Sequence, residues 1–331
     1  MKKNNSLFRL TFFLLTLIVL VTLVRFFSFY KITGNKDKTF SNKFLEHYAI
    51  YAVPMPENLN FSGEPVPIEK YDVFESLDRE FLVNTYWQSQ TLLFIKRANK
   101  YFPIIEPILK KNNIPEDFKY LALAESGLTN VASPSHAVGF WQFLKKTAIQ
   151  YGLTVNNNID ERYHLEKSTQ AACDYLNAAY DIFGNWTLVA ASYNVGMKSL
   201  KNQLRKQQVS SYYNLYLNQQ TARYVYRIIA IKYILSNPEK YGFHFRQKDL
   251  YRYPKFKIDT IDTTITSLED FSISQSINLK LLKDMNPWIR GRQLLNPDSI
   301  KYAIKVPLKR NFLEDFSSQE EQDSVSPVDS I

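Results

Sequence analysis

Apolar residues at helical spacing dominate the middle of the chain. Between residues 80 and 245 apolar positions recur every three to four residues, and nothing alternates as a β-strand does. The clearest helical runs cover residues 81–95, 120–125, 172–183, 186–194 and 221–236. Pro103 and Pro107 predict a short turn between the first two runs, and Ser168 is typical of a helix cap. The pattern predicts a mainly α-helical domain.

The pattern changes near Tyr251. Alternation at residues 256–259 and 302–307 predicts two strands, and apolar spacing at 268–271 and 279–285 predicts two short helices between them. The predicted order is β-α-α-β. We expect a small, self-contained C-terminal module.

A different apolar run lies near the N-terminus. Residues 10–24 carry no charge and follow three basic residues, and the apolar character resumes after Arg25. If Arg25 snorkels to the interface, Leu10–Tyr30 gives about 21 residues, or about 31 Å of helix, which is enough to span a bilayer. A cleaved signal peptide is the alternative, but no small-x-small site follows the run. We therefore expect residues 1–30 to be an uncleaved transmembrane anchor with the rest of the chain outside the membrane.

These patterns divide the chain into five parts. After the anchor, residues 31–75 are polar and interrupted by four prolines, which predicts a linker. Residues 76–248 form the predicted helical domain, and residues 251–310 form the small module. The last part, residues 311–331, is rich in acids and is predicted to be disordered.

Composition and charge narrow the classes of partner. The chain is 45% apolar and 15% aromatic, which indicates a folded protein. Its net charge is +9, but six acids and no base lie in residues 314–331, so residues 1–313 carry 41 bases against 26 acids. A basic surface suits nucleic acid, anionic lipid or an anionic polymer such as peptidoglycan. No nucleic-acid-binding signature is present, so we expect no nucleic-acid partner.

Cysteine and histidine usage gives no sign of a metal or a disulfide. Cys173 is the single cysteine and falls in a helical apolar pattern, so we interpret it as a buried apolar residue. The four histidines have no metal-ligand spacing. We expect neither a metal nor a cofactor.

One acid has an unusual setting. Glu125 follows five residues without charge, and Gly127 then predicts the end of the helix. A carboxyl held among apolar side chains keeps its proton to higher pH, so Glu125 is a candidate general acid. A helix-terminal Glu that simply meets solvent is the alternative. Asp117 lies two helical turns earlier, about 12 Å away along the axis, and is a poor candidate for a partner carboxylate.

The residues around Glu125 resemble the catalytic segment of a known family, the lytic murein transglycosylases with a soluble-lytic-transglycosylase domain. The matching residues are Glu125-Ser126, Ser133, Ala137, Gly139-Phe140-Trp141-Gln142-Phe143 and Thr147-Ala148, and later the second signature, Ala191-Ser192-Tyr193-Asn194-Val195-Gly196. The pattern is most similar to the membrane-bound lytic transglycosylase D branch, through Tyr151-Gly152-Leu153, Asp160-Glu161-Arg162, Ser168-Thr169-Gln170-Ala171-Ala172 and Tyr241-Gly242-Phe243. The resemblance implies a lysozyme-like fold for the helical domain.

The C-terminal module has a resemblance of its own. With Asn286-Pro287-Trp288 ahead of the second strand, it is similar to a LysM glycan-binding module. A packing appendage is an equally open interpretation.

The resemblance also implies a reaction and a set of site residues. Glu125 would protonate the glycosidic oxygen between MurNAc and GlcNAc, and the muramoyl 6-hydroxyl rather than water would attack, leaving a 1,6-anhydroMurNAc end. Gln142, Tyr193 and Asn194 would line the sugar cleft, and Ser133 and Tyr224 match further cleft positions. A lone acid fits such a reaction, whereas ordinary glycosidases need two carboxyls.

The expected function is thus a peptidoglycan lytic transglycosylase in cell-wall remodelling, anchored in a bacterial membrane on its periplasmic side. Two alternatives stay open: a lysozyme-type muramidase on the same fold, and a non-catalytic peptidoglycan-binding protein.

Overall fold

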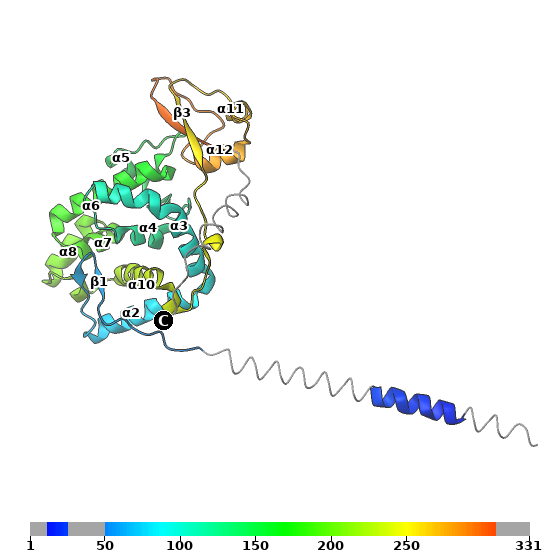
Figure 1. The fold of residues 1–331 in the computed structure, drawn as a ribbon. Coiled ribbons are helices and arrows are strands. Elements are labelled where there is room, and N and C mark those ends of the chain that lie inside the picture. Colours follow the sequence, from blue (N-terminus) through cyan, green and yellow to red (C-terminus); the bar gives the residue numbers. More distant parts are fainter. Residues whose placement is uncertain (1–11, 26–49, 309–331) are drawn as a thin grey trace, which may run out of the picture. The chain divides into compact units, whose positions relative to one another are not determined.

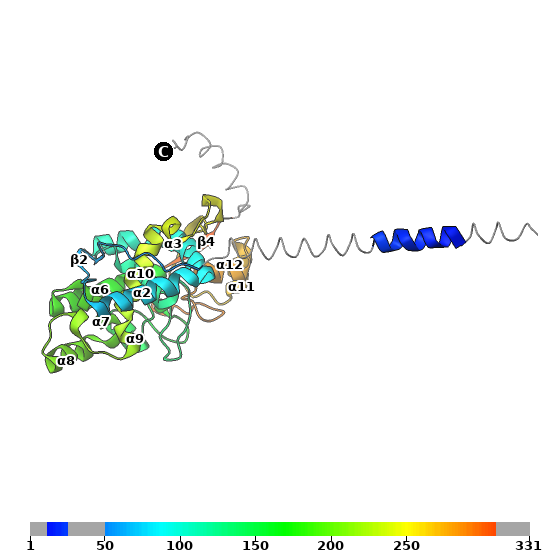
Figure 2. The ribbon, with the colours of Figure 1, turned by 90° about the horizontal axis from the view of Figure 1, so that it is seen from below.

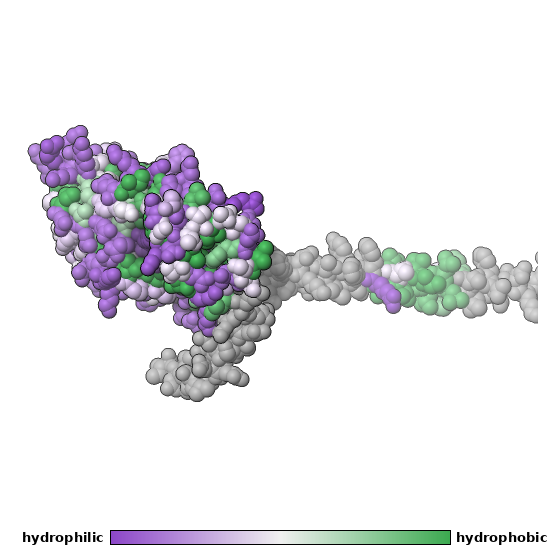
Figure 3. Space-filling model, turned by 90° about the horizontal axis from the view of Figure 1, so that it is seen from above, coloured by the Kyte–Doolittle hydropathy of each residue, from purple (hydrophilic) through white to green (hydrophobic). Residues whose placement is uncertain are grey.

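The computed structural model describes residues 12–25 and 50–308, which fall into two compact units divided after Ala52. In the N-terminal unit, residues 12–25 form one exposed helix, drawn almost wholly in the colour of hydrophobic residues in Figure 3. Among the described residues, no helix combines the length and hydrophobicity that crossing a bilayer requires. The predicted anchor, Leu10–Tyr30, lies partly outside the described residues. The predicted disordered tail, residues 311–331, lies wholly outside them.

The second unit begins earlier than the sequence pattern indicates. Its first elements are two short antiparallel strands, β1 (Asn60–Phe61) and β2 (Glu64–Pro65). Phe61 is fully buried, and its ring meets the edge of Phe118 at a centroid distance of 5.3 Å. The linker predicted for residues 31–75 is therefore wrong from residue 53 onward. Of the four prolines that predicted the linker, Pro65 is the last residue of β2.

The rest of the unit up to residue 250 is helical (Figures 1 and 2). Its α-helices are α2 (Tyr71–Tyr86), α3 (Gln88–Lys111), α4 (Phe118–Ser126), α5 (Lys145–Gln150), α6 (Leu165–Phe183), α7 (Trp186–Val195), α8 (Met197–Gln207), α9 (Gln219–Ala222) and α10 (Tyr224–Ser236). Its 3-10 turns are η1 (Glu161–Tyr163), η2 (Tyr212–Asn214), η3 (Pro238–Tyr241) and η4 (Gln247–Asp249).

Two local predictions in this region are wrong. Pro103 and Pro107 do not form a separate turn but lie inside the long helix α3. Ser168 does not cap a helix, because α6 begins three residues earlier with His164 as its N-cap. The Ser168 hydroxyl instead donates to the carbonyl of Leu165 within the helix.

Helix α10 is the centre of the helical domain. It is apolar on nearly every side, which is the pattern of a fully buried helix. Its buried residues include Val225, Ile228, Ile229, Ile231 and Ile234. It packs against α2, α4 and α7, which surround it (Figure 1). This packing fixes α4, the helix that carries Glu125.

The C-terminal module has the predicted β-α-α-β order. Strands β3 (Phe256–Ile261) and β4 (Tyr302–Pro307) pair antiparallel, and α11 (Leu268–Ser274) and α12 (Leu279–Met285) lie between them in sequence. The module has its own apolar core around Leu268, Trp288 and Ile304. It is not self-contained as predicted, because Ile159 of the helical domain is part of the same core.

Candidate active site

Glu125 lies in the last turn of α4, and the turn's geometry comes from its sequence. Gly127 ends the helix with φ of 60°, a left-handed conformation that costs glycine little. Its carbonyl accepts a hydrogen bond from Arg97 Nη1 at 3.1 Å. Ser126 Oγ donates to the carbonyl of Phe140 at 2.8 Å, so the end of the helix is tied to the loop that follows.

Two contacts eight residues apart hold α4 against α10. At the start of α4, Asp117 forms an ion pair with Lys232 at 2.6 Å. At its end, the Tyr224 hydroxyl donates to Glu125 Oε1. Asp117 and Glu125 are separated by two helical turns, and so are Tyr224 and Lys232, so the two helices run antiparallel in one register. Asp117, expected to be a poor partner carboxylate, instead helps to set this register.

A loop forms the second wall of the site. We call residues 130–144 the cavity loop. Gly139 has φ of 79°, and a Cβ there would lie 2.1 Å from the carbonyl oxygen of Arg162, so no other residue fits without moving the backbone. Gln142 Nε2 donates to the carbonyls of Gly139 at 2.8 Å and Val131 at 3.1 Å. Ser133 Oγ accepts from the amide of Ala137 at 3.0 Å. The loop is thus closed on itself by its own polar side chains.

The third wall comes from the end of α7 and the start of α10. Tyr193 lines the cavity, and its hydroxyl donates to the carbonyl of Trp141 at 2.7 Å. Asn194 Oδ1 accepts from Thr221 Oγ1 at 3.1 Å.

These walls enclose one cavity of about 590 Å³. All six residues singled out in the sequence line it: Glu125, Ser133, Gln142, Tyr193, Asn194 and Tyr224. They come from four separate stretches of the chain, which only the fold brings together. A second, larger cavity of about 740 Å³ lies between the helical domain and the module, and none of the six lines it.

Sequence reasoning missed one charged residue of the cavity, Arg227. It lies three residues after Tyr224 on α10 and so shares a helix face with it, a spacing that could have identified it. Behind the cavity, the buried Glu80 accepts from Arg223 Nε at 2.7 Å and lies 3.7 Å from Arg227 Nε. Glu80 therefore balances part of the positive charge of Arg227.

The carboxyl of Glu125 is the electrostatic centre of the cavity. Burial raises its pKa from 4.5 to about 7, and the Tyr224 hydrogen bond and the charge of Arg227 offset only part of that rise. Burial also raises the pKa of Tyr224 well above its usual value, so its hydroxyl stays protonated and donates. At neutral pH Glu125 is therefore divided between acid and carboxylate, the condition for both giving and taking a proton.

No second carboxyl shares the cavity. Among its lining residues that the structure describes, Glu125 is the one acid. Across residues 12–25 and 50–308, no three His, Cys, Asp or Glu side chains are grouped as a metal site requires. The chemistry of the cavity rests on one proton-transferring group, with amides, hydroxyls and one guanidinium around it.

The raised pKa predicts an unusual dependence of stability on pH. Between pH 4.5 and 7 the folded protein keeps a proton at Glu125 that the unfolded chain has lost, so the free energy of unfolding falls as pH rises. The loss is on the order of 3 kcal/mol. Glu125→Gln removes the titration, so its stability relative to the wild type should increase by about that amount between pH 4 and pH 8. Urea unfolding of both proteins across this range measures it; parallel pH curves would contradict it.

Comparisons with known proteins agree with the two-part organisation. Residues 102–216 match the family model of the transglycosylase SLT domain. Residues 257–310 match that of the soluble lytic transglycosylase C-terminal LysM-like domain. The SLT-domain match contains all the cavity-lining residues before Gln220. The LysM-like match spans nearly the whole β-α-α-β module.

Individual relatives match shorter parts of the chain. The membrane-bound lytic murein transglycosylase D of Escherichia coli K12 is 32% identical over 159 residues, which are 46% of this chain and 35% of the relative. A putative tributyltin chloride resistance protein of Alteromonas sp. strain M-1 is 29% identical over 30% of this chain and 49% of its own length. The first of these matches thus spans about a third of the relative's length.

A solved structure also matches. It is an inactive mutant of the lytic transglycosylase Slt from Pseudomonas aeruginosa, 15% identical, with a TM-score of 0.33 over 47% of this chain and 26% of that one. A likeness at this level supports no conclusion on function. Residues 102–216 thus match a transglycosylase SLT domain and residues 257–310 a LysM-like domain, and 159 residues of the chain are homologous to part of the membrane-bound lytic murein transglycosylase D.

Proposed function

We propose that this protein is a peptidoglycan lytic transglycosylase. It cleaves the β-1,4 bond between MurNAc and GlcNAc without water and leaves 1,6-anhydroMurNAc ends. The observation that carries the proposal is the single buried carboxyl, Glu125, whose pKa of about 7 suits an acid that later acts as a base. The SLT domain match and the homology to a lytic murein transglycosylase support the same reaction class.

In the proposed first step, Glu125 gives its proton to the glycosidic oxygen as the bond from that oxygen to C1 of MurNAc breaks. The carbonyl oxygen of the sugar's own N-acetyl group stabilises C1. The carboxylate of Glu125 now accepts a hydrogen bond from Tyr224, which stabilises the charge that protonation of the leaving group creates.

In the second step, the Glu125 carboxylate takes the proton of the 6-hydroxyl, and O6 forms the new bond to C1. The proton count closes, because Glu125 ends as it began and no water is consumed. Most glycosidases use a second carboxylate as nucleophile or as the base for water, and among the described lining residues of the cavity Glu125 is the one acid.

The remaining cavity residues would hold the glycan. We assign sugar contacts to the amides of Gln142 and Asn194 and to the hydroxyl of Ser133, which lie on two of the cavity's walls. We assign Tyr193 to the same cleft as an aromatic wall residue, fixed in place by the bond from its hydroxyl to the Trp141 carbonyl. A lysozyme-like fold for the helical domain belongs to this proposal.

We further propose that the protein is anchored in a bacterial membrane by Leu10–Tyr30 and works on the periplasmic side. The support is the uncharged run at residues 10–24, of which residues 12–24 belong to a helix with an exposed apolar surface. The homologous murein transglycosylase D is also described as membrane-bound.

The product distinguishes the proposed reaction from hydrolysis. Digested sacculi should yield muropeptides one water lighter than a muramidase releases, as measured by mass spectrometry. Glu125→Gln keeps the side chain's shape but cannot give up a proton, so release should fall by at least about a hundredfold. Reducing ends would indicate a lysozyme-type muramidase. No release from sacculi with native peptides would favour a non-catalytic binding protein.

Anchoring is tested by fractionation. The full chain should sediment with membranes and resist extraction with high salt, whereas a chain that begins at Lys36 should remain in the supernatant, because it lacks the apolar run. N-terminal sequencing of the protein purified from cells checks processing. A mature protein that starts beyond Tyr30 would contradict the anchor.

A further inference from the structure

The segment between α5 and η1 physically joins the C-terminal module to the helical domain. Ile159 belongs to this segment, yet its side chain is 2% exposed and lies in the core of the module with Trp288 and Ile289. Ile159 and Ile289 also form an antiparallel β-bridge. The module's core is therefore incomplete without a side chain from the helical domain.

Backbone hydrogen bonds on both sides of Ile159 fix the segment to the module. The Asp160 amide donates to the carbonyl of Trp288 at 2.9 Å, and the Arg290 amide donates to the carbonyl of Asn158 at 2.9 Å. Asn158 Nδ2 donates to the carbonyl of Leu295 at 3.2 Å. The module thus helps to position the backbone of Asp160, together with the bridge of Asp160 to Val155 within the segment.

The side chain of Asp160 holds Arg162 in a two-pronged ion pair. Arg162 Nε donates to Asp160 Oδ1 at 2.9 Å, and Nη2 donates to Oδ2 at 2.8 Å. Both side chains are about 10% exposed. A paired and buried guanidinium of this kind has little freedom to rotate, so Asp160 fixes the direction of the remaining Arg162 nitrogen.

That nitrogen holds the cavity loop. Arg162 Nη1 donates to the carbonyl of His136 at 3.2 Å and to the carbonyl of Phe143 at 3.1 Å. His136 lies six residues before Gln142, and Phe143 follows it directly. The Phe143 carbonyl also accepts from the amide of Val138. The carbonyl of Arg162 itself lies against Gly139. One side chain thus spans the loop that carries Ser133 and Gln142.

We propose that Arg162 is a positioning residue and that the C-terminal module, through Ile159 and Asp160, holds the cavity loop in place for catalysis. The module would then be part of the active-site scaffold, whatever affinity it has for glycan. The kinetic consequence rests on the proposed function, whereas the positioning itself does not.

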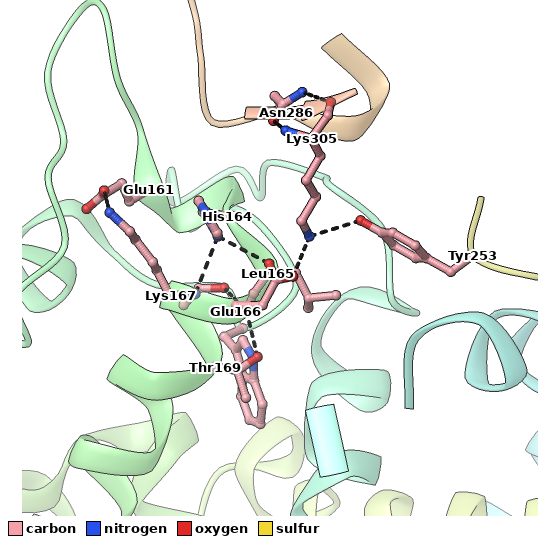
Figure 4. A network of polar contacts seen from close by, with 11 residues as sticks. Glu161, His164, Leu165, Glu166, Lys167, Thr169, Tyr253, Asn286 and Lys305 are labelled. Carbon is pink, nitrogen blue, oxygen red and sulfur yellow. Dashed lines mark hydrogen bonds and ion pairs between the residues drawn. The ribbon is translucent and has the colours of Figure 1, made fainter. Parts of the chain in front are cut away.

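A second contact across the same junction provides a matched control. Lys305 of β4 forms an ion pair with Glu166 of α6, and its Nζ donates to the Tyr253 hydroxyl at 3.3 Å (Figure 4). Asn286 Nδ2 donates to the carbonyl of Lys305 at 2.7 Å, and Asn286 Oδ1 accepts from the amide of Lys305 at 2.9 Å. Within the described part of the chain, the side chains of Lys305 and Glu166 bond each other, Tyr253 and His164, all of which lie outside the cavity loop. Lys305→Met therefore weakens the junction without releasing the loop.

The test compares Arg162→Lys, Ile159→Ala and Lys305→Met in the full chain by amide hydrogen exchange. Lysine cannot keep both the fork to Asp160 and the two carbonyl bonds. The amides of Val138, Gly139 and Gln142 should then exchange at least about tenfold faster relative to the amides of α10, which report global stability. Ile159→Ala should give a smaller increase at the same amides. Lys305→Met should lower the melting temperature and leave that ratio unchanged.

Kinetics on sacculi gives the second readout. In Arg162→Lys, kcat/KM should fall by roughly ten- to a hundredfold, because a misplaced loop misorients the sugar. The pH of half-maximal activity should stay unchanged, since Glu125 and Tyr224 lie on other elements. Lys305→Met should stay within about twofold of the wild type. Equal effects of Arg162→Lys and Lys305→Met, or an unchanged exchange ratio in Arg162→Lys, would overturn the inference. A wild type that cleaves nothing refutes the proposed function alone, because the exchange ratio is still decisive for positioning.

Discussion

The buried contact between Glu125 and Tyr224 is the constraint on which the rest of the site depends. A carboxyl at the end of α4 is largely shielded from water inside the cavity, and a hydroxyl that does not ionise at neutral pH donates to it. Such a group is unfavourable for folding above its pKa, so the surrounding structure must hold it in place. The ion pair of Asp117 with Lys232 at the far end of the same helices does so by fixing their register. The site thus costs folding free energy at neutral and higher pH, and the remote Asp117–Lys232 ion pair helps to keep it in place.

One side of the cavity is positioned by the apolar core of the helical domain, and the other side also depends on contacts to the C-terminal module. α4, α7 and α10 belong to one apolar core, and Glu125, Tyr193 and Tyr224 are placed by that core. The cavity loop is anchored in the same core by Phe140, Trp141 and Phe143. The course of its remaining backbone is set by Gly139, by the polar bonds of Gln142 and by Arg162. A core-positioned acid beside a glycan-binding loop suits a reaction in which the acid must keep a fixed position while the loop binds the substrate. It also gives the LysM-like module a structural role, because the module holds the segment that holds Arg162.

The sequence was sufficient for the elements that depend on local pattern. Helical spacing identified α7 and α10, alternation identified β3 and β4, and Gly127 marked the end of α4 because a left-handed residue is needed there. It failed where tertiary packing decides. In the sequence, Phe61 belongs to a proline-bearing stretch, and its contact with Phe118 cannot be predicted from that stretch. In the same way, the residues adjacent to Ile159 in the sequence do not indicate that it belongs to the module's core. The candidate site residues came from motif resemblance. Arg227 could have been added from its spacing to Tyr224. Arg162 stands in a matching motif, but its contacts to the cavity loop join distant segments and cannot be inferred from the sequence pattern.

The central claim is that Glu125 holds a proton in the folded protein at neutral pH. Carbon-13 NMR of the side-chain carboxyls, with Glu125→Gln used to assign the signal, measures that proton directly. The account predicts that the Glu125 carboxyl titrates with a pKa near 7, well separated from the other acids. A midpoint near 4.5, the ordinary value for a solvated glutamate, would contradict it and remove the physical basis for a single residue acting as both acid and base.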